Sequence, residues 1–449
     1  MRTGMARPSQ KSAAAAPAMA VPATTRAARF FLAVLQFACP LLFFTNLTRN
    51  PYFTQIALLF IGIALCGVAW AVETFRRGEW RIPRLPFETP LLAFLAAAMI
   101  CSLVSFGVHA LLRPGLAFEM TRVWIFTIVN CVLALYLPLV FTTPLGGDGQ
   151  PHRAITSDLV MAILWGAGWV AFAQMKTNDP SQTIWDPYGG FLWAIGLLYA
   201  IARTRHGDAR SIFHVVFVVS FLAGAYGILQ YAGHDIIWTS PVQPYGGRPV
   251  STFGNPNFLS SYLMLACPLA IAFALRAQKA QRWGYAVVAL VSGLGILSTL
   301  TRSTYVGLAA ALLAMGAALF RREDLRFVKI ATVALVAFVA FILLFPSTPV
   351  THVQSPLARF TEIFEAMKTG QSYGPWHQRL LIWSSAWEMQ KGFQLVGRGW
   401  GTFELFYPFF QGKFLLIPQL AQWRTHANNA HNVLLEFWSQ TGLLGTGAS

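Results

Sequence analysis

Long apolar segments recur along almost the whole of this sequence. They lie at 30–47, 53–72, 90–112, 121–142, 158–175, 189–202, 211–232, 257–275, 284–299, 304–320 and 328–346. A helix needs about 20 mostly apolar residues to cross the hydrocarbon core of a bilayer, and many of these runs approach that length. Only 11% of the residues are charged, whereas a soluble domain carries about a quarter. The sequence therefore predicts an all-α, polytopic membrane protein with about 11 to 12 transmembrane helices.

The distribution of basic residues predicts the orientation of these helices. Of the 33 lysine and arginine residues, 20 fall in the N-terminal tail and in those alternate loops that an inside start places in the cytoplasm. Six fall in the short loops of the other side, and the remaining seven lie in the long loop 347–430. Long loops cross the membrane largely regardless of charge. This bias favours a cytoplasmic N-terminus. It also accounts for the net charge of +16, so we expect no nucleic-acid partner.

We expect four parts in the chain. Residues 1–29 are rich in Ala, Pro, Ser and Thr, which is typical of a disordered cytoplasmic tail. Residues 30–346 form an eleven-helix transmembrane domain, and 347–430 form a long outer loop that acts as a lid. The apolar part of 431–449 is too short to span a membrane. We expect a further transmembrane helix to begin there and the sequence to be truncated within it.

The long outer loop contains two local signals. Leu380, Trp383 and Trp387 recur at helical spacing within 377–391, which predicts an amphipathic helix at the membrane surface or under the lid. The following segment, 397–403, has three glycines at alternate positions. Glycines permit a tight turn, but no Lys-Ser/Thr pair follows as in a Walker loop. This segment is therefore only a weak phosphate-binding signal.

Polar residues gather in the loop before the eighth apolar run. Arg248 lies close in sequence to Asn255 and Asn257, and the Asn-Pro pair at 255–256 follows a glycine. Such a pair marks a fixed turn at the start of a helix. A simple capping turn explains the asparagines, but it does not explain Arg248.

Two further outer positions could carry chemistry. Arg302 lies in a very short hairpin between two apolar runs, so it must sit at the outer membrane face. It is either a snorkelling interfacial arginine or a functional one, and the outer face normally avoids arginine. His431 and Asn432 follow a stretch crowded with His and Asn, directly before an apolar segment. A lone histidine there is a helix cap, a packed residue or a catalytic group.

Together these residues suit transfer from a lipid-linked phosphate. An arginine guanidinium is permanently charged and binds phosphate oxygens with a planar fork. Two or three such groups at the bilayer surface could stabilise a departing diphosphate, and a neutral histidine could take a proton from an acceptor hydroxyl. The chain has no Asp-x-Asp motif, and acidic residues are sparse in the outer loops. We therefore expect no divalent metal and no other cofactor.

A transporter is the alternative from a different class. Ion-coupled transporters usually carry ionisable residues within their membrane-spanning helices. The middles of these apolar runs have essentially none, and the polar candidates cluster on one face. This pattern favours an enzyme at the membrane surface.

Five segments in their order resemble the O-antigen ligase/polymerase superfamily, in its Wzy_C-type core. They are Ser251-Thr-Phe-Gly-Asn-Pro-Asn-Phe258, Thr301-Arg-Ser-Thr-Tyr-Val-Gly307, Arg379-Leu-Leu-Ile-Trp383, Leu395-Val-Gly-Arg-Gly-Trp-Gly-Thr-Phe403 and Ala430-His-Asn-Val-Leu-Leu-Glu-Phe-Trp-Ser-Gln-Thr-Gly-Leu-Leu-Gly445. The resemblance covers roughly 210–445. It departs from the family in two places. The family's Gly-Pro-Gly is Gly399-Trp400-Gly401 here, and the terminal span is missing.

The resemblance implies a metal-independent, inverting membrane glycosyltransferase with a GT-C-like fold in the bacterial inner membrane. Members of this superfamily take glycan from an undecaprenyl-diphosphate carrier on the periplasmic side. The expected acceptor is lipid A-core, as in O-antigen ligases. A second lipid-linked repeat, as in polymerases, or a protein, as in O-oligosaccharyltransferases, are alternatives. Some relatives are labelled bicarbonate transporters, so a small-anion transporter stays open as a different class.

The resemblance also assigns roles to individual residues. Arg302 and His431 correspond to the arginine that binds the diphosphate and to the essential histidine. The remaining positions would contact the diphosphate or shape the pocket: Arg248, Arg379, Asn255, Asn257 and Asn432. Membrane lipids surround all of these sites.

Overall fold

The computed structural model describes residues 31, 34–41, 51–78, 88–116, 119–120, 154–175, 187–204, 209–235, 245–320, 325–351, 355–369 and 374–448. All regular secondary structure in these residues is helical, which confirms the predicted all-α class. The predicted tail 1–29 and the predicted span 121–142 lie outside the described residues, and the span 30–47 is described only in part.

Seven helices in the described residues are long and apolar enough to cross a membrane. They are α2 (Pro51–Arg77), α3 (Glu88–Leu112), α5 (Ile155–Met175), α7 (Ala209–Tyr231), α8 (Pro256–Arg276), α9 (Lys279–Ser298) and α10 (Arg302–Phe320). The apolar helices α6 (Pro187–Thr204) and α11 (Leu325–Leu344) coincide with two further predicted runs. These helices confirm a polytopic membrane protein.

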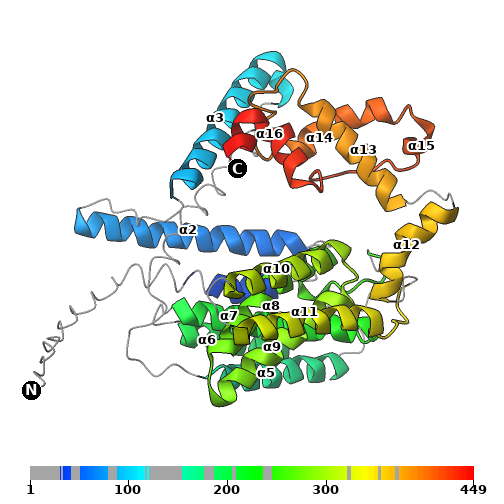
Figure 1. The fold of residues 1–449 in the computed structure, drawn as a ribbon. Coiled ribbons are helices and arrows are strands. Elements are labelled where there is room, and N and C mark those ends of the chain that lie inside the picture. Colours follow the sequence, from blue (N-terminus) through cyan, green and yellow to red (C-terminus); the bar gives the residue numbers. More distant parts are fainter. Residues whose placement is uncertain are drawn as a thin grey trace, which may run out of the picture.

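Helices α5 to α11 pack into one bundle (Figure 1). Helix α9 packs against α7 and α8, and α10 packs against α8 and α11. Glycines let α7 and α9 approach closely, because a Cβ atom on Gly295 would lie only 3.0 Å from the Cα atom of Gly224. Close backbone contact of this kind stabilises helix pairs in lipid, where the hydrophobic effect does not drive helices together.

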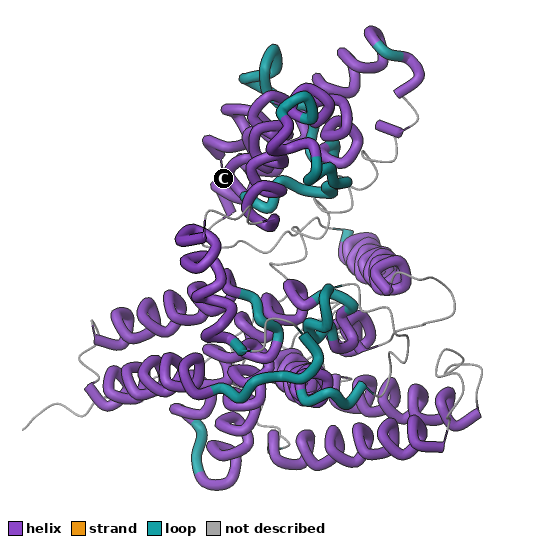
Figure 2. Tube along the Cα trace, turned by 90° about the vertical axis from the view of Figure 1, so that its right-hand side faces the viewer, coloured by secondary structure: helices purple, strands orange, loops and turns teal. Residues whose placement is uncertain are grey.

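A second group of helices packs around the C-terminal part of the chain. It contains α3, followed by the short η1 (Pro114–Leu116), together with α13 (Gly374–Met389), α14 (Phe403–Phe414), α15 (Pro418–Ala421) and α16 (Val433–Ala448). Figures 1 and 2 both show this group apart from the α5–α11 bundle, with α12 (Pro356–Thr369) between the two in Figure 1. The described part of the predicted loop 347–430 therefore carries four helices, α12 to α15.

Helix α13 confirms the helix that the spacing within 377–391 predicts. Its buried side, however, is formed by Leu381, Ile382, Ser385, Ala386 and Met389. Of these, Ile382, Ala386 and Met389 share a core with Phe403, Phe406 and Tyr407 of α14. The apolar side of α13 thus supports the second helix group.

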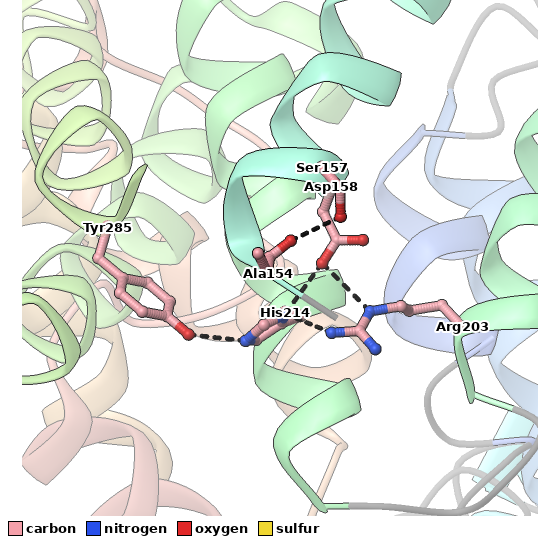
Figure 3. A network of polar contacts seen from close by, with 6 residues as sticks. All are labelled: Ala154, Ser157, Asp158, Arg203, His214 and Tyr285. Carbon is pink, nitrogen blue, oxygen red and sulfur yellow. Dashed lines mark hydrogen bonds and ion pairs between the residues drawn. The ribbon is translucent and has the colours of Figure 1, made fainter. Parts of the chain in front are cut away.

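Four buried polar side chains join α5, α6, α7 and α9 at one end of the bundle (Figure 3). The Arg203 Nε atom donates to Asp158 Oδ2 at 3.1 Å, and His214 Nδ1 lies 2.9 Å from the same oxygen. On its other side, His214 Nε2 lies 2.7 Å from the hydroxyl of Tyr285. These residues lie near the helix ends, so the middles of the spans keep their apolar character. The network ties together four helices that share few polar contacts in lipid.

We expect Asp158→Ala to destabilise the bundle by about 3 to 5 kcal/mol, because it removes the buried carboxylate that both Arg203 and His214 contact. Tyr285→Phe removes one hydrogen bond from the same network and should cost only about 1 kcal/mol. Thermal unfolding of both variants in detergent measures the difference. Equal unfolding temperatures for Asp158→Ala and the parent would contradict a structural role for this network.

Candidate functional site

Arg248 is anchored at the opposite end of the bundle from this network. Its Nε atom donates to the carbonyl of Thr299 at 2.9 Å, and its Nη2 atom donates to Thr301 Oγ1 at 2.6 Å and to Asn257 Oδ1 at 3.3 Å. Burial, followed by the positive charges of Arg359 and Arg302, lowers the pKa of Arg248 to about 10. The guanidinium therefore stays charged at neutral pH, between the start of α8 and the turn from α9 to α10.

Asn255 confirms the predicted turn at the start of α8. Its side-chain oxygen accepts a hydrogen bond from the backbone N–H of Asn257 at 2.8 Å, which caps the helix, and Pro256 occupies the first helical position. The Asn255 amide also donates to the hydroxyl of Tyr245 at 3.0 Å. Asn255 therefore caps α8, while the neighbouring Asn257 accepts a hydrogen bond from Arg248.

Gln230, at the end of α7, holds the segment that carries Arg248. Its side-chain oxygen accepts hydrogen bonds from the backbone N–H groups of Val250 at 3.1 Å and Ser251 at 2.7 Å. Its amide donates to Asp235 at 3.1 Å. Ser251 begins the short helix η3 (Ser251–Phe253) with a positive φ of 48°, a conformation that costs free energy unless its surroundings stabilise it. A glutamine at the end of an apolar run was the sequence signal for this role, which our sequence analysis missed.

Arg302 is the first residue of α10 and belongs to a group of charges. Its Nη1 atom donates to the backbone carbonyl of Arg359 at 3.2 Å and lies 3.7 Å from Glu362 Oε2. Arg359 Nη1 lies 2.5 Å from the same oxygen. We call Arg248, Arg302 and Arg359 the arginine cluster. Sequence analysis missed Arg359 and Glu362, whose spacing of three residues in the long loop was their only signal.

His431 lies in the loop that leads into α16. Its backbone has a positive φ of 50°, and its N–H donates to Asn429 Oδ1 at 3.0 Å. Asn432 caps α16, because its side-chain oxygen accepts from the N–H groups of Leu434 at 3.0 Å and Leu435 at 3.2 Å. The loop therefore holds the His431 backbone in one conformation while the residue stays exposed.

The imidazole of His431 is suited to act as a base. Desolvation by nearby protein atoms, and secondly the positive charge of Arg379 on α13, hold the pKa of His431 below its usual value. The neutral form is thus the main form at neutral pH. The adjacent backbone is fixed as well, since Trp383 Nε1 donates to the carbonyl of Ala430 at 3.0 Å and Glu436 accepts from the Ala430 N–H.

The seven predicted site residues fall into two sets. The structure brings Arg248, Asn255, Asn257 and Arg302 together at one end of the α5–α11 bundle. It brings Arg379, His431 and Asn432 together in the second helix group. The two sets belong to helix groups that Figures 1 and 2 show apart, so the structure does not bring them to one another.

The backbone of the glycine segment 397–401 is hydrogen-bonded to other parts of the protein, so this segment is not a phosphate-binding loop. Its five backbone N–H groups donate to protein acceptors, which are Phe393 O, Ser439 O, Gln440 O, Ser102 Oγ and Gln440 Oε1. Two N–H groups of α16 donate back, from Leu443 to Gln394 and from Leu444 to Leu395. Amides that are satisfied in this way have no hydrogen left for a phosphate.

We expect Gly397→Ala to destabilise the second helix group by about 2 to 4 kcal/mol. Gly397 has a φ of 64°, and a Cβ atom there would lie 2.3 Å from the backbone carbon of Gln440. Gly412→Ala is the matched control, because a Cβ atom at that position of α14 meets nothing within 4 Å. Thermal unfolding of both variants provides the comparison. If Gly397→Ala proves as stable as Gly412→Ala, the backbone of Gly397 does not pack closely against that of Gln440.

Comparison with known families gives one match. Residues 287–448 match the family model Wzy_C, described as O-antigen ligase. The matched segment includes Arg302, Arg379, His431 and Asn432, and it begins after Arg248 and its neighbouring asparagines. No curated protein and no solved structure matches the chain. The match supports glycan transfer of the O-antigen ligase type at the level of the family. Over residues 287–448, the chain is therefore similar to the O-antigen ligase family.

Proposed function

We propose that the chain transfers glycan from an undecaprenyl-diphosphate carrier to lipid A-core, at the periplasmic face of the bacterial inner membrane. The observation that carries this proposal is the arginine cluster. Arg248, Arg302 and Arg359 come from three separate segments and meet at one end of the transmembrane bundle. Like charges held together repel one another, and a multiply charged anion would offset that repulsion. A lipid-linked diphosphate at the bilayer surface has this charge and this location.

In the proposed reaction the arginines bind the diphosphate and stabilise it as the leaving group. His431 takes the proton of the acceptor hydroxyl, whose oxygen then attacks the anomeric carbon of the donor. The bond between that carbon and the diphosphate oxygen breaks, and the carrier leaves as undecaprenyl diphosphate. A single displacement of this kind inverts the anomeric configuration. Permanent arginine charges supply the stabilisation that a divalent metal gives in other transferases, so we propose a metal-independent reaction.

Both sets of site residues must face one substrate in this mechanism. Helix α12 carries Arg359 and lies in the chain between the bundle and the helix group that holds His431. A lipid-linked glycan is a large, extended ligand that can contact both sets. We therefore propose that donor and acceptor together span the arginine cluster and His431.

Two other acceptors are compatible with the same donor site. A second lipid-linked repeat would make the chain a polymerase, and a protein hydroxyl would make it a protein O-oligosaccharyltransferase. Transport of a small anion is the candidate from a different class. The observation that favours it is the buried Asp158–His214 contact near the helix ends of the bundle, because buried ionisable residues in membrane proteins often mark ion pathways.

The test uses the full-length protein in liposomes with undecaprenyl-diphosphate glycan and EDTA. Donor loss is followed with lipid A-core, a second lipid-linked repeat or an acceptor protein present. We expect donor loss with lipid A-core and a product of inverted anomeric configuration. Transfer to one of the other acceptors would replace the ligase assignment by that activity. No donor loss with any acceptor would contradict glycan transfer, and solute flux would then be measured.

A further inference from the structure

Glu362 places a carboxylate inside the arginine cluster. Its Oε2 atom lies 2.5 Å from Arg359 Nη1 and 3.7 Å from Arg302 Nη1. The side chains of Arg359, Arg302 and Glu362 are 15%, 21% and 28% exposed, respectively, so water reaches all three. Helix α12, which carries Glu362, packs against α11 and thereby holds this carboxylate at the end of the bundle.

The described residues of the cluster include three arginines and one carboxylate. One carboxylate faces Arg302 and Arg359, and Arg248 lies close enough for both of their charges to lower its pKa. In addition, Arg359 Nε is buried and makes no hydrogen bond within the described part of the chain. A buried guanidinium nitrogen without an acceptor is costly. The cluster therefore has a donor to spare, on Arg359, for an anion with more acceptor oxygens than one carboxylate.

We propose that Arg359 is a third binding residue for the diphosphate, and that the Glu362 carboxylate holds the place of one phosphate group until the donor binds. This inference rests on the proposed function, whose donor site it extends. A carboxylate and a phosphate accept the same planar fork of guanidinium hydrogens. A diphosphate carries more negative charge and more acceptor oxygens than Glu362, so it displaces the carboxylate from Arg302 and reaches Arg359 Nε.

The alternative is that Glu362 only stabilises α12 through its ion pair with Arg359, three residues earlier. The two interpretations predict different changes in anion affinity when Glu362 loses its charge. If Glu362 competes with the ligand, then removal of its charge tightens anion binding. If Glu362 only orders α12 and its arginine for the ligand, then removal of its charge leaves anion binding unchanged or weakens it.

The test measures equilibrium binding of labelled undecaprenyl diphosphate to the full chain in nanodiscs of neutral lipid. Glu362→Gln should lower the Kd roughly fivefold, and Arg359→Ala should raise it roughly tenfold. Glu365→Gln removes the same charge from an exposed position on the same helix and should leave the Kd unchanged. Glu362→Asp keeps the charge on a shorter side chain and should lie between the parent and Glu362→Gln.

Competition identifies the source of the anion. Inorganic diphosphate should displace the labelled lipid at a higher concentration than unlabelled undecaprenyl diphosphate, because it lacks the lipid contacts. Phosphatidylglycerol should displace it poorly. Displacement by phosphatidylglycerol as effective as by undecaprenyl diphosphate would overturn the diphosphate assignment. A Kd for Glu362→Gln equal to or above that of the parent, with the unfolding temperature unchanged, would overturn the role of Glu362.

Donor consumption in the same preparations separates this inference from the proposed function. If the parent consumes donor while Glu362→Gln binds no tighter, then the inference fails and the function stands. If the parent consumes no donor while Glu362→Gln binds diphosphate more tightly, then the function fails and the anion site stands. If both the inference and the proposed function hold, Glu362→Gln should also show a KM for the donor that is roughly fivefold lower.

Discussion

Arg302→Ala is expected to lower kcat/KM for donor consumption by about a thousandfold or more, since an arginine on a departing phosphate contributes on the order of 10³ to 10⁵ in rate. Arg302 begins α10 and points its guanidinium at the carbonyl of Arg359 and at Glu362. Its charge therefore lies at the centre of the proposed diphosphate site. The measurement is the loss of labelled donor over time in liposomes that contain the full chain.

Two controls make this prediction specific. Arg302→Lys keeps the charge but loses the planar fork, so it should retain part of the activity, with a loss of about 10- to 100-fold. Arg424→Ala removes an exposed arginine of the second helix group and should leave the rate unchanged. The proposed role of Arg302 does not survive if Arg302→Ala keeps more than a tenth of the parent rate while it binds donor normally.

His431→Ala should reduce the rate by about 10² to 10⁴, the usual contribution of a positioned general base. His426→Ala is the matched control within the same loop. His426 pairs with Glu404 at 2.9 Å, and we assign it no part in the reaction. Rates for both variants under saturating donor and acceptor provide the comparison. Equal losses for the two variants would mean that the loop, and not the imidazole of His431, is what the reaction needs.

The pH dependence provides a second readout for His431. Desolvation and the charge of Arg379 lower the pKa of His431, and a general base works only in its neutral form. The rate should therefore be constant near neutral pH and fall only as the pH drops through this lowered pKa. Arg379→Gln removes one of the two causes, so the pKa rises and the acidic fall in rate moves to higher pH. An unchanged profile, or a shift to lower pH, would argue against this role for His431.

The apolar runs predicted the transmembrane helices well. The predicted run 257–275 lies within α8, which begins at Pro256 because Asn255 caps it, as the Asn-Pro pair indicated. The run 304–320 corresponds to α10, whose first residue is Arg302. Such agreement is expected where a membrane demands continuous helix, because each apolar stretch must satisfy its own backbone hydrogen bonds.

The long loop was harder to predict because tertiary contacts organise it. The side of α13 that packs was not evident from its tryptophans, since Trp387 is 54% exposed while Met389 is buried. Arg398 lies over the ring of Phe393 at 4.1 Å and donates to the carbonyl of Met389. Sequence spacing contains no information on such contacts between α13, the glycine segment and its surroundings. The same holds for Gln230, Arg359 and Glu362, which function through partners far away in the sequence.

The resemblance supplied what the spacing did not, namely the proposed roles of Arg302 and His431. The structure adds the neighbours of each residue, and it shows that the two residues lie in different helix groups. Donor and acceptor must therefore connect them if the mechanism is right. This requirement is central, because in the proposed mechanism neither set of residues alone carries out glycan transfer.

The most direct test is a structure of the full chain in a lipid nanodisc with undecaprenyl-diphosphate-linked glycan bound. We expect the diphosphate within hydrogen-bond distance of Arg248, Arg302 and Arg359, the Glu362 carboxylate displaced from Arg302, and His431 facing the acceptor side of the first sugar. A diphosphate bound elsewhere, such as beside the Asp158–His214 network at the other end of the bundle, would contradict it.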